Sequence, residues 1–206
     1  MKKIIPSLDY ESELWQNGEK IVAGIDEVGR GAWAGPVVAA AVVFKPDHKQ
    51  IDLVKDSKML TPSQRARLNE QIQSSCKSYG IGVVDNVMID QVNIGTATKL
   101  AMQKAIESLE NYPDYILVDA MELDGYCNCR YQAVIKGDQI IYSISCASIV
   151  AKVARDNMMS KLDKKYEQYF FDVHKGYGTQ KHQQALQEHG PCDLHRYSYK
   201  PVGRMI

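Results

Sequence analysis

The sequence has no long hydrophobic run and no pattern of a secretory signal at its start. Its longest nearly apolar stretch, Ala32 to Phe44, is well short of the roughly 20 residues that a membrane-spanning helix needs. Lys2 and Lys3 give a basic start, but Ile4-Ile5 runs directly into Pro6, so the apolar core of a signal peptide is missing. We therefore expect a cytoplasmic protein without a membrane partner.

The number of cysteines is small and odd. The chain has five cysteines among 206 residues, and a chain of this size does not need crosslinks to fold, which favours a reducing compartment. Cys127 and Cys129 lie close together, but no second Cys or His pair follows nearby, so the spacing of a structural zinc site is missing. We expect the cysteines to be packing residues.

An excess of either charge is also missing. The 25 basic and 25 acidic residues give a formal net charge of zero, which argues against a bulk polyelectrolyte binder but allows a local basic face. Residues 174–206 hold four of the five histidines and more basic than acidic residues: Lys175, Lys181, Arg196, Lys200 and Arg204 against Glu188 and Asp193. The C-terminal end is therefore the expected surface for a polyanion.

Hydrophobic patterning predicts one α/β domain over residues 1–206, with residues 1–20 as an N-terminal arm that has a possible helical turn near Leu8 to Trp15. Apolar runs predict strands at 21–26, 36–44, 79–85, 115–119 and 131–135. Helical spacing and caps predict helices from 61 to about 77, a short one from 86, and then 93–109, 143 to about 166, and 180–188. This order indicates a mixed sheet with helices on its faces.

The stretch from 24 to 31 holds residues that suit the binding of a cation and of a phosphate. Asp26 and Glu27 end a predicted strand, and adjacent strand residues point to opposite faces, so one carboxylate should face the covered side. A bound cation would remove the cost of burying that charge. Gly29 and Gly31 leave backbone N–H groups open to an anion, and Arg30 would reach a phosphate or a sugar edge. The alternative is a tight strand–loop turn with solvated charges.

Four carboxylates share one position in the pattern. Asp26 with Glu27, Asp119 and Asp138 each follow an apolar, strand-like segment. If they converge, their repulsion requires cations, and oxygen ligands suit Mg²⁺ or Mn²⁺. Two such ions about 4 Å apart activate a water and neutralise the leaving oxygen of a phosphodiester. The alternative for each single residue is a turn or a helix cap.

Several ordered blocks resemble the ribonuclease HII family over about residues 20–202. The first is 24–31, which is followed by 34–42, 56–58, 93–94, 97–98, 101–102, the strand ending at Asp119, 136–138, 147–149, 151–153, 155–156, 176–179, 190–191 and 195–196. The related ribonuclease HIII type has an additional N-terminal domain and lacks the arginine between the two glycines. With Arg30 present, the sequence fits the HII type.

The resemblance implies a ribonuclease H-like fold with a helical C-terminal region. It implies an endonuclease that hydrolyses RNA paired to DNA and incises 5′ of single ribonucleotides in duplex DNA, leaving 5′-phosphates, in DNA replication and repair. Asp26, Glu27, Asp119 and Asp138 match the family's metal-binding carboxylates, which hold Mn²⁺ or Mg²⁺, two per site. The implied partners are RNA–DNA hybrids and ribonucleotide-containing duplexes, and we expect a monomer.

The resemblance also assigns substrate contacts. It implies that Gly29, Arg30 and Gly31 sense the 2′-hydroxyl at the ribonucleotide junction, the group that separates RNA from DNA. Tyr177 matches a tyrosine that packs on the adjoining deoxyribose, and residues from about 170 to 206 form a substrate-contacting region. Lys58 and Lys152 are expected to hold phosphates.

Some residues depart from the family or carry a second interpretation. Ala120 stands where relatives are expected to have glycine, and Trp33 and the tail 196–200 are unusual. Arg155 is a further candidate for a phosphate contact, and Asp156 is expected in an ion pair or on a solvated face rather than in the metal site.

Three histidines would assist proton transfer in one interpretation, but surface histidines without a catalytic role are the expectation: His174, His182 and His195. Two further activities stay open. One is a non-catalytic binder of hybrid duplexes, and the other is a metal-dependent phosphatase acting on small substrates.

Overall fold

A mixed sheet organises the chain, whose computed structural model describes residues 5–54 and 57–204, without the side chain of Lys58. In these residues five strands lie in the order β3-β2-β1-β4-β5. They are β1 (Val22–Val28), β2 (Val37–Val43), β3 (Ser78–Val84), β4 (Tyr115–Asp119) and β5 (Arg130–Val134). Strand β2 runs antiparallel to β1 and β3, whereas β4 runs parallel to β1 and β5. The five predicted strands and the mixed sheet are confirmed.

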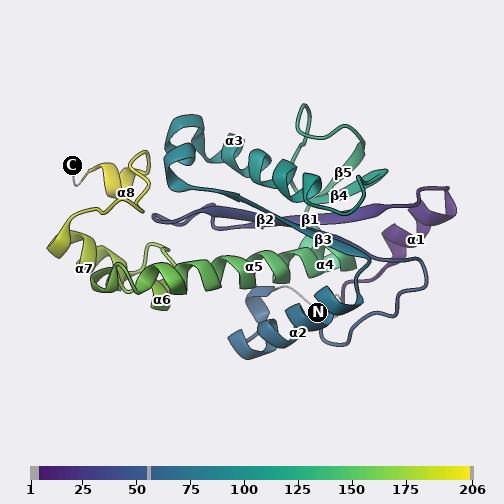
Figure 1. Cartoon of the computed structure of the whole chain (residues 1–206), viewed down its shortest axis with the longest axis horizontal. Helices are drawn as coiled ribbons and strands as arrows, with labels where there is room; N and C mark the ends of the chain where they lie inside the picture. The colour runs from purple at the N-terminus through teal and green to yellow at the C-terminus, as the bar shows by residue number, and fades with distance from the viewer. Residues whose placement is uncertain (1–4, 55–56, 205–206) are drawn as a thin grey trace.

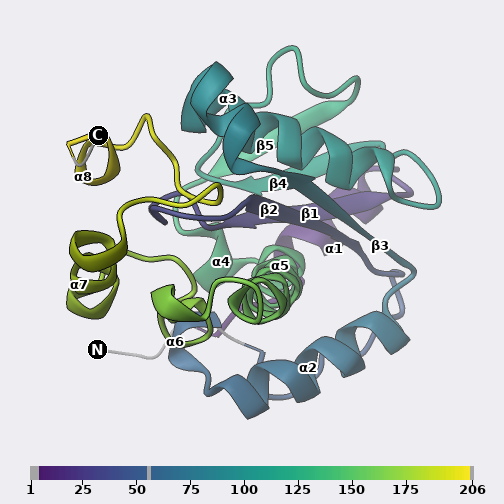
Figure 2. The same ribbon diagram turned by 60° about the vertical axis from the view of Figure 1, so that its left-hand side comes forward.

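Two long helices cover the two faces of the sheet (Figures 1 and 2). Helix α3 (Asn86–Glu107) packs on one face, mainly over β2 and β3, and α5 (Tyr142–Asp163) packs on the other, over β1 and β2. Helix α2 (Pro62–Ser75) lies outside α5 (Figure 2). These layers bury every residue of β2, as its unbroken apolar sequence predicts for a strand covered on both faces.

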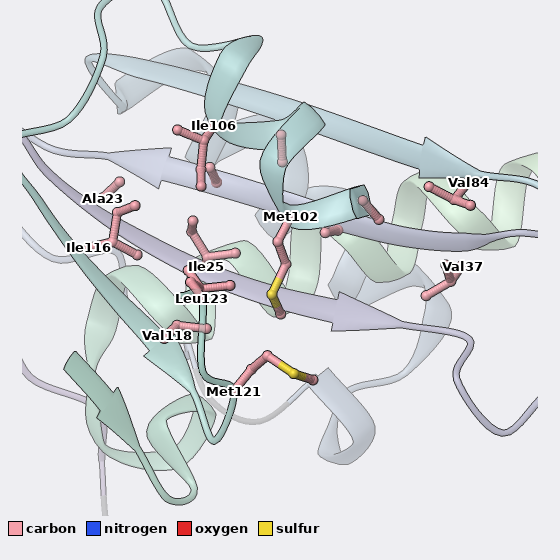
Figure 3. Close-up of a cluster of buried hydrophobic side chains, with 14 of the residues drawn as sticks. Ala23, Ile25, Val37, Val84, Met102, Ile106, Ile116, Val118, Met121 and Leu123 are labelled. Atoms are coloured by element: carbon pink, nitrogen blue, oxygen red, sulfur yellow. The ribbon is translucent and has the colours of Figure 1, made fainter. Parts of the chain in front are cut away.

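The core between α3 and the sheet is built from aliphatic side chains together with Met102 and Met121 (Figure 3). Strand β3 brings its glycines against the helix: a Cβ at Gly82 would lie 1.9 Å from the carbonyl oxygen of Ala101. The missing side chain therefore lets α3 approach the sheet closely.

Local sequence sets two helix boundaries. Thr61 and Gln64 form the predicted capping box of α2. Asn93 has a φ of 68° within α3, and its Oδ1 accepts a hydrogen bond from the N–H of Thr96, so it caps the second half of a kinked helix. The two helices predicted around position 93 are thus one element with a break between its halves.

The N-terminal segment is tied to the domain. The helical turn predicted near Leu8 to Trp15 is α1 (Asp9–Gln16). Glu11 in this helix is 1% exposed, and its Oε1 accepts a 2.8 Å hydrogen bond from the backbone N–H of Ser143 at the start of α5. The segment therefore caps the central helix.

Short helices extend past one end of the sheet (Figure 1). The predicted helix α7 (Gln180–His189) is present, and five one-turn helices were missed: η1 (Ser57–Met59), α4 (Gly137–Ile140), η2 (Glu167–Tyr169), α6 (Phe171–His174) and α8 (Lys200–Gly203). A single turn is too short to show a helical period in the sequence.

All five cysteines are free thiols. No helix within the described ranges has the length and apolar character to cross a bilayer.

Candidate active site

Two carboxylates meet because β4 ends at Asp119 beside Asp26 of its parallel neighbour β1. Ile25 of β1 is paired with Val118 of β4, so the next residues, Asp26 and Asp119, follow in the same register. A pocket of about 370 Å³ opens there. It is lined by Asp26, Glu27, Val28, Ser57, Asp119, Ser148, Lys152 and Tyr177.

The carboxylates of this pocket destabilise one another's charged forms. Burial, followed by the charge of Glu27, raises the pKa of Asp26 well above its ordinary range, and Asp119 adds to this repulsion. Burial also raises the pKa of Glu27, although Arg30 opposes the shift with a 3.3 Å ion pair between Nη1 and Oε1. Like charges are thus gathered where water is scarce.

A divalent cation fits this donor set. Glu27 Oε2 is buried and has no hydrogen-bond partner in the described chain, so one oxygen lacks a donor or a cation. Carboxylate oxygens are the ligands that Mg²⁺ and Mn²⁺ prefer. Among the residues that the structure describes, no group of three His, Cys, Asp or Glu side chains is already placed closely enough to hold a metal ion.

Asp138 reaches the site through its neighbour in the chain. Lys136 takes a left-handed conformation with a φ of 60°, and this turn brings the N–H of Gly137 to 2.7 Å from Asp119 Oδ1. Asp138 follows directly and is 5% exposed, but it is not among the residues that line the 370 Å³ pocket. The structure thus brings three of the four predicted carboxylates to one pocket and places the fourth beside it.

The two glycines around Arg30 have different structural reasons. Gly29 has a φ of +95°, and a Cβ there would lie 2.2 Å from Nε of Arg155, so the fold itself requires glycine. Gly31 is exposed, and a Cβ there would meet nothing within 4 Å. The fold therefore gives no reason for glycine at position 31.

Tyr177 joins the C-terminal region to the pocket. It forms an isolated β-bridge with Ala32, close to the glycines, and its ring lies 5.7 Å from Nζ of Lys152. Lys152 also forms a 2.8 Å ion pair with Asp156, which has the predicted ion-pair role. Both Lys152 and Tyr177 line the pocket, whereas the side chain of Lys58 lies outside the described structure.

Two expectations about basic residues are wrong. Arg155 does not hold a phosphate, because it is fully buried and donates to the carbonyl oxygens of Pro36, Lys175 and Ala34. The histidines expected at the surface are in fact buried: His174 is 7% exposed, and His182 and His195 are 0% exposed.

Burial lowers the pKa of His182 and of His195 to about 4. Their Nε2 atoms lie 3.1 Å apart, so the two rings share a hydrogen bond inside the C-terminal region. They are core residues because each polar ring atom finds a partner there.

Three site residues were missed from the sequence. Ser57 and Ser148 line the pocket, with their Oγ atoms 2.9 Å apart. Arg196 is fully buried and binds the loop that follows Arg30. Hydroxyls and a single arginine carry no periodic signal, and their partners lie far away in the sequence.

Known proteins match this chain over nearly its whole length. The family model described as ribonuclease HII matches residues 23–202. Ribonuclease HII of Listeria monocytogenes is 48% identical over 94% of this chain and 73% of the relative, and that of Caldicellulosiruptor bescii is 46% identical over 93% and 92%. The crystal structure of ribonuclease H2 from Pyrococcus horikoshii superposes with a TM-score of 0.76 at 27% identity, covering 90% of this chain and 96% of the other. The chain therefore belongs to the ribonuclease HII family, whose members are endonucleases.

Proposed function

We propose that this chain is a divalent-metal-dependent endonuclease that hydrolyses the RNA strand of RNA–DNA hybrids and incises 5′ of single ribonucleotides in duplex DNA. Membership of the ribonuclease HII family supports action on the RNA of hybrids. The observation that carries the metal-dependent step is the cluster of Asp26, Glu27 and Asp119, in which one buried carboxylate oxygen has no partner in the described chain.

In this proposal Asp26, Glu27, Asp119 and Asp138 hold two ions, Mg²⁺ or Mn²⁺. When bound, such ions supply an activated water and neutralise the charge that develops on the departing oxygen. The chain contributes the position of the ligands. The parallel register sets Asp26 beside Asp119, the N–H of Gly137 orients Asp119, and Arg30 restrains Glu27.

The loop from 29 to 31 is proposed to read the ribonucleotide. Gly31 is exposed and unhindered, so a sugar can approach its backbone closely, and a 2′-hydroxyl both donates and accepts hydrogen bonds. Arg30 has a half-exposed side chain whose Nη1 lies 3.3 Å from Glu27 Oε1. The positive charge of Arg30 therefore lies beside the proposed metal site.

Tyr177 is proposed to pack on the sugar of the adjoining deoxynucleotide, with Lys152 beside it as a phosphate contact. Both side chains line the same pocket as the carboxylates. Lys58 is proposed as a second phosphate contact on the basis of the family resemblance alone. Carboxylates, loop and tyrosine all come from one chain, so we also propose that residues 1–206 form one catalytic domain, with 170–206 as its substrate-contacting part, and act as a monomer.

The decisive experiment incubates the protein with a DNA duplex that contains one ribonucleotide, with Mg²⁺, with Mn²⁺ or with a chelator. We expect incision 5′ of the ribonucleotide with a divalent ion and none with the chelator. Asp119→Asn should abolish incision while keeping duplex binding, and Asp52→Asn, at an exposed position, should leave both unchanged. Failure to incise this duplex and a long hybrid with either ion refutes the proposal.

A further inference from the structure

The loop from 30 to 35 is held by the C-terminal segment. Arg196 Nη1 donates to the carbonyl oxygen of Arg30 at 3.0 Å, and its Nε and Nη2 donate to that of Gly35 at 3.0 and 2.9 Å. Its backbone N–H also donates to the carbonyl oxygen of Trp33 at 2.8 Å. One residue therefore bridges the two ends and the middle of this loop.

The buried guanidinium of Arg196, like that of Arg155, donates to backbone carbonyl groups. The side chain is 0% exposed, and no carboxylate within the described ranges lies at ion-pair distance from it. Burying a guanidinium without an acidic partner is costly unless each donor is used. A planar fork of donors satisfied by carbonyl oxygens is a rigid clamp.

Tyr199 completes the clamp. Its hydroxyl also donates to the carbonyl oxygen of Arg30, and it accepts a 3.1 Å hydrogen bond from Arg196 Nη1. Two donors from the C-terminal segment thus converge on a single carbonyl group of the loop.

The direction of this carbonyl fixes the direction of the next N–H. In a trans peptide the C=O and N–H groups point in opposite directions. The carbonyl of Arg30 points inward to the buried Arg196, so the N–H of Gly31 points outward, at an exposed glycine that has no neighbour to block it. Rotation of this peptide would turn the N–H away from the surface.

We propose that Arg196, together with Tyr199, is a positioning residue that fixes the Arg30–Gly31 peptide and thereby sets how strongly the enzyme prefers a ribonucleotide over a deoxyribonucleotide at the junction. This inference rests on the proposed function. Neither residue touches the reacting atoms. Their effect passes through the backbone donor that they aim at the substrate.

The test measures discrimination separately from activity. Incision of a duplex with one ribonucleotide gives kcat and KM, and a DNA-only duplex of the same sequence, used as a competitor, gives Ki. We expect Tyr199→Phe to lower the ratio of Ki to KM by about 3- to 10-fold, the value of one hydrogen bond, and Arg196→Lys to lower it further. The Ki for DNA should stay unchanged. Hydrogen exchange of residues 30–35 in the free protein should become faster in both variants, with β1 unchanged.

Tyr169→Phe is the matched control, because its hydroxyl also donates a single hydrogen bond to a backbone carbonyl, that of Gly190. It should leave the ratio and the exchange of the loop unchanged. If Arg196→Lys does not fold, Tyr199→Phe decides alone. Normal incision with an unchanged ratio in Tyr199→Phe, or an equal loss in Tyr169→Phe, overturns this inference only. A parent chain that incises neither substrate overturns the proposed function itself.

Discussion

The Oε1 atom of Glu11 accepts a hydrogen bond from the backbone N–H of Ser143, which joins an N-terminal helix to the start of the central helix α5. The other oxygen of Glu11 is buried without a partner in the described chain. Burial raises the pKa of Glu11 above its ordinary range. The carboxyl group is thus needed as an acceptor but destabilised as a charge.

The hydrogen bond between Glu11 and Ser143 predicts different changes in stability for two substitutions of Glu11. Glu11→Gln keeps the acceptor and removes the charge, whereas Glu11→Ala leaves a buried N–H unsatisfied and should lower the free energy of unfolding by about 1–3 kcal/mol. A raised pKa means that the folded chain favours the protonated form of Glu11. The contribution of Glu11 to the stability of the parent is therefore fully present at acidic pH and is lost as the pH rises through the raised pKa. The stability of Glu11→Gln relative to the parent should therefore increase from pH 4 to pH 8.

Urea unfolding of the parent and both variants across that range checks this prediction. Subtracting the parent curve removes the contribution of other acids. A stability difference between Glu11→Gln and the parent that does not change with pH would contradict the assigned charge effect.

Substitutions of Gly29 and Gly31 are predicted to affect stability and activity differently. Gly31→Ala meets no atom, so it should change the free energy of unfolding by no more than about 0.5 kcal/mol. It should nevertheless lower kcat/KM on a single-ribonucleotide duplex by about 10- to 100-fold, because a methyl group displaces the sugar. Gly29→Ala combines a positive φ with a collision against Arg155 and should cost about 2–4 kcal/mol of stability.

Thermal unfolding together with incision kinetics distinguishes these effects. The proposed role of Gly31 in reading the substrate is wrong if Gly31→Ala cuts as efficiently as the parent.

The carboxylate cluster predicts that metal stabilises the fold. Mn²⁺ at about 100 times its dissociation constant should raise Tm by roughly 5–10 °C over a chelated sample. Asp26→Asn removes one of the repelling charges, so in chelator it should be more stable than the parent, and added Mn²⁺ should raise its Tm much less.

Differential scanning calorimetry with and without Mn²⁺ measures both effects, with Asp52→Asn as the exposed control. Equal Mn²⁺ shifts in the parent and in Asp26→Asn would exclude Asp26 as a ligand.

Ala120 predicts a stabilising substitution next to the site. It has a φ of 46°, in the left-handed region that disfavours a side chain, and the family resemblance leads us to expect glycine here. Ala120→Gly should raise the free energy of unfolding by about 0.5–1 kcal/mol, because relief of strain exceeds the added freedom of the unfolded chain. Ala133→Gly, in the extended strand β5, should lower it by a similar amount. Denaturant unfolding of both variants tests the pair, and two losses would show that the strain is negligible.

Much of the fold was readable because its signals are local. The apolar runs predicted all five strands, and Thr61 with Gln64 marked the start of α2. The carboxylates that follow apolar runs also indicated side chains that the fold brings together, since Asp26 and Asp119 lie side by side on the parallel strands β1 and β4.

What the sequence did not reveal depends on distant partners. An arginine looks like a surface cation until its acceptors are known, and those of Arg155 are carbonyl groups from three separate positions. The burial of His182 depends in the same way on His195 and on the backbone of Tyr177. Such residues have no repeat that would distinguish a buried side chain from an exposed one.

The clamp on the loop also has a consequence during synthesis. Arg30 and Arg196 are separated by 166 residues, so a growing chain carries the loop long before it carries the residue that holds it. Until then the two side-chain donors that hold the carbonyl of Arg30 are missing. By the inference above, the preference for a ribonucleotide is therefore acquired only when this last segment docks.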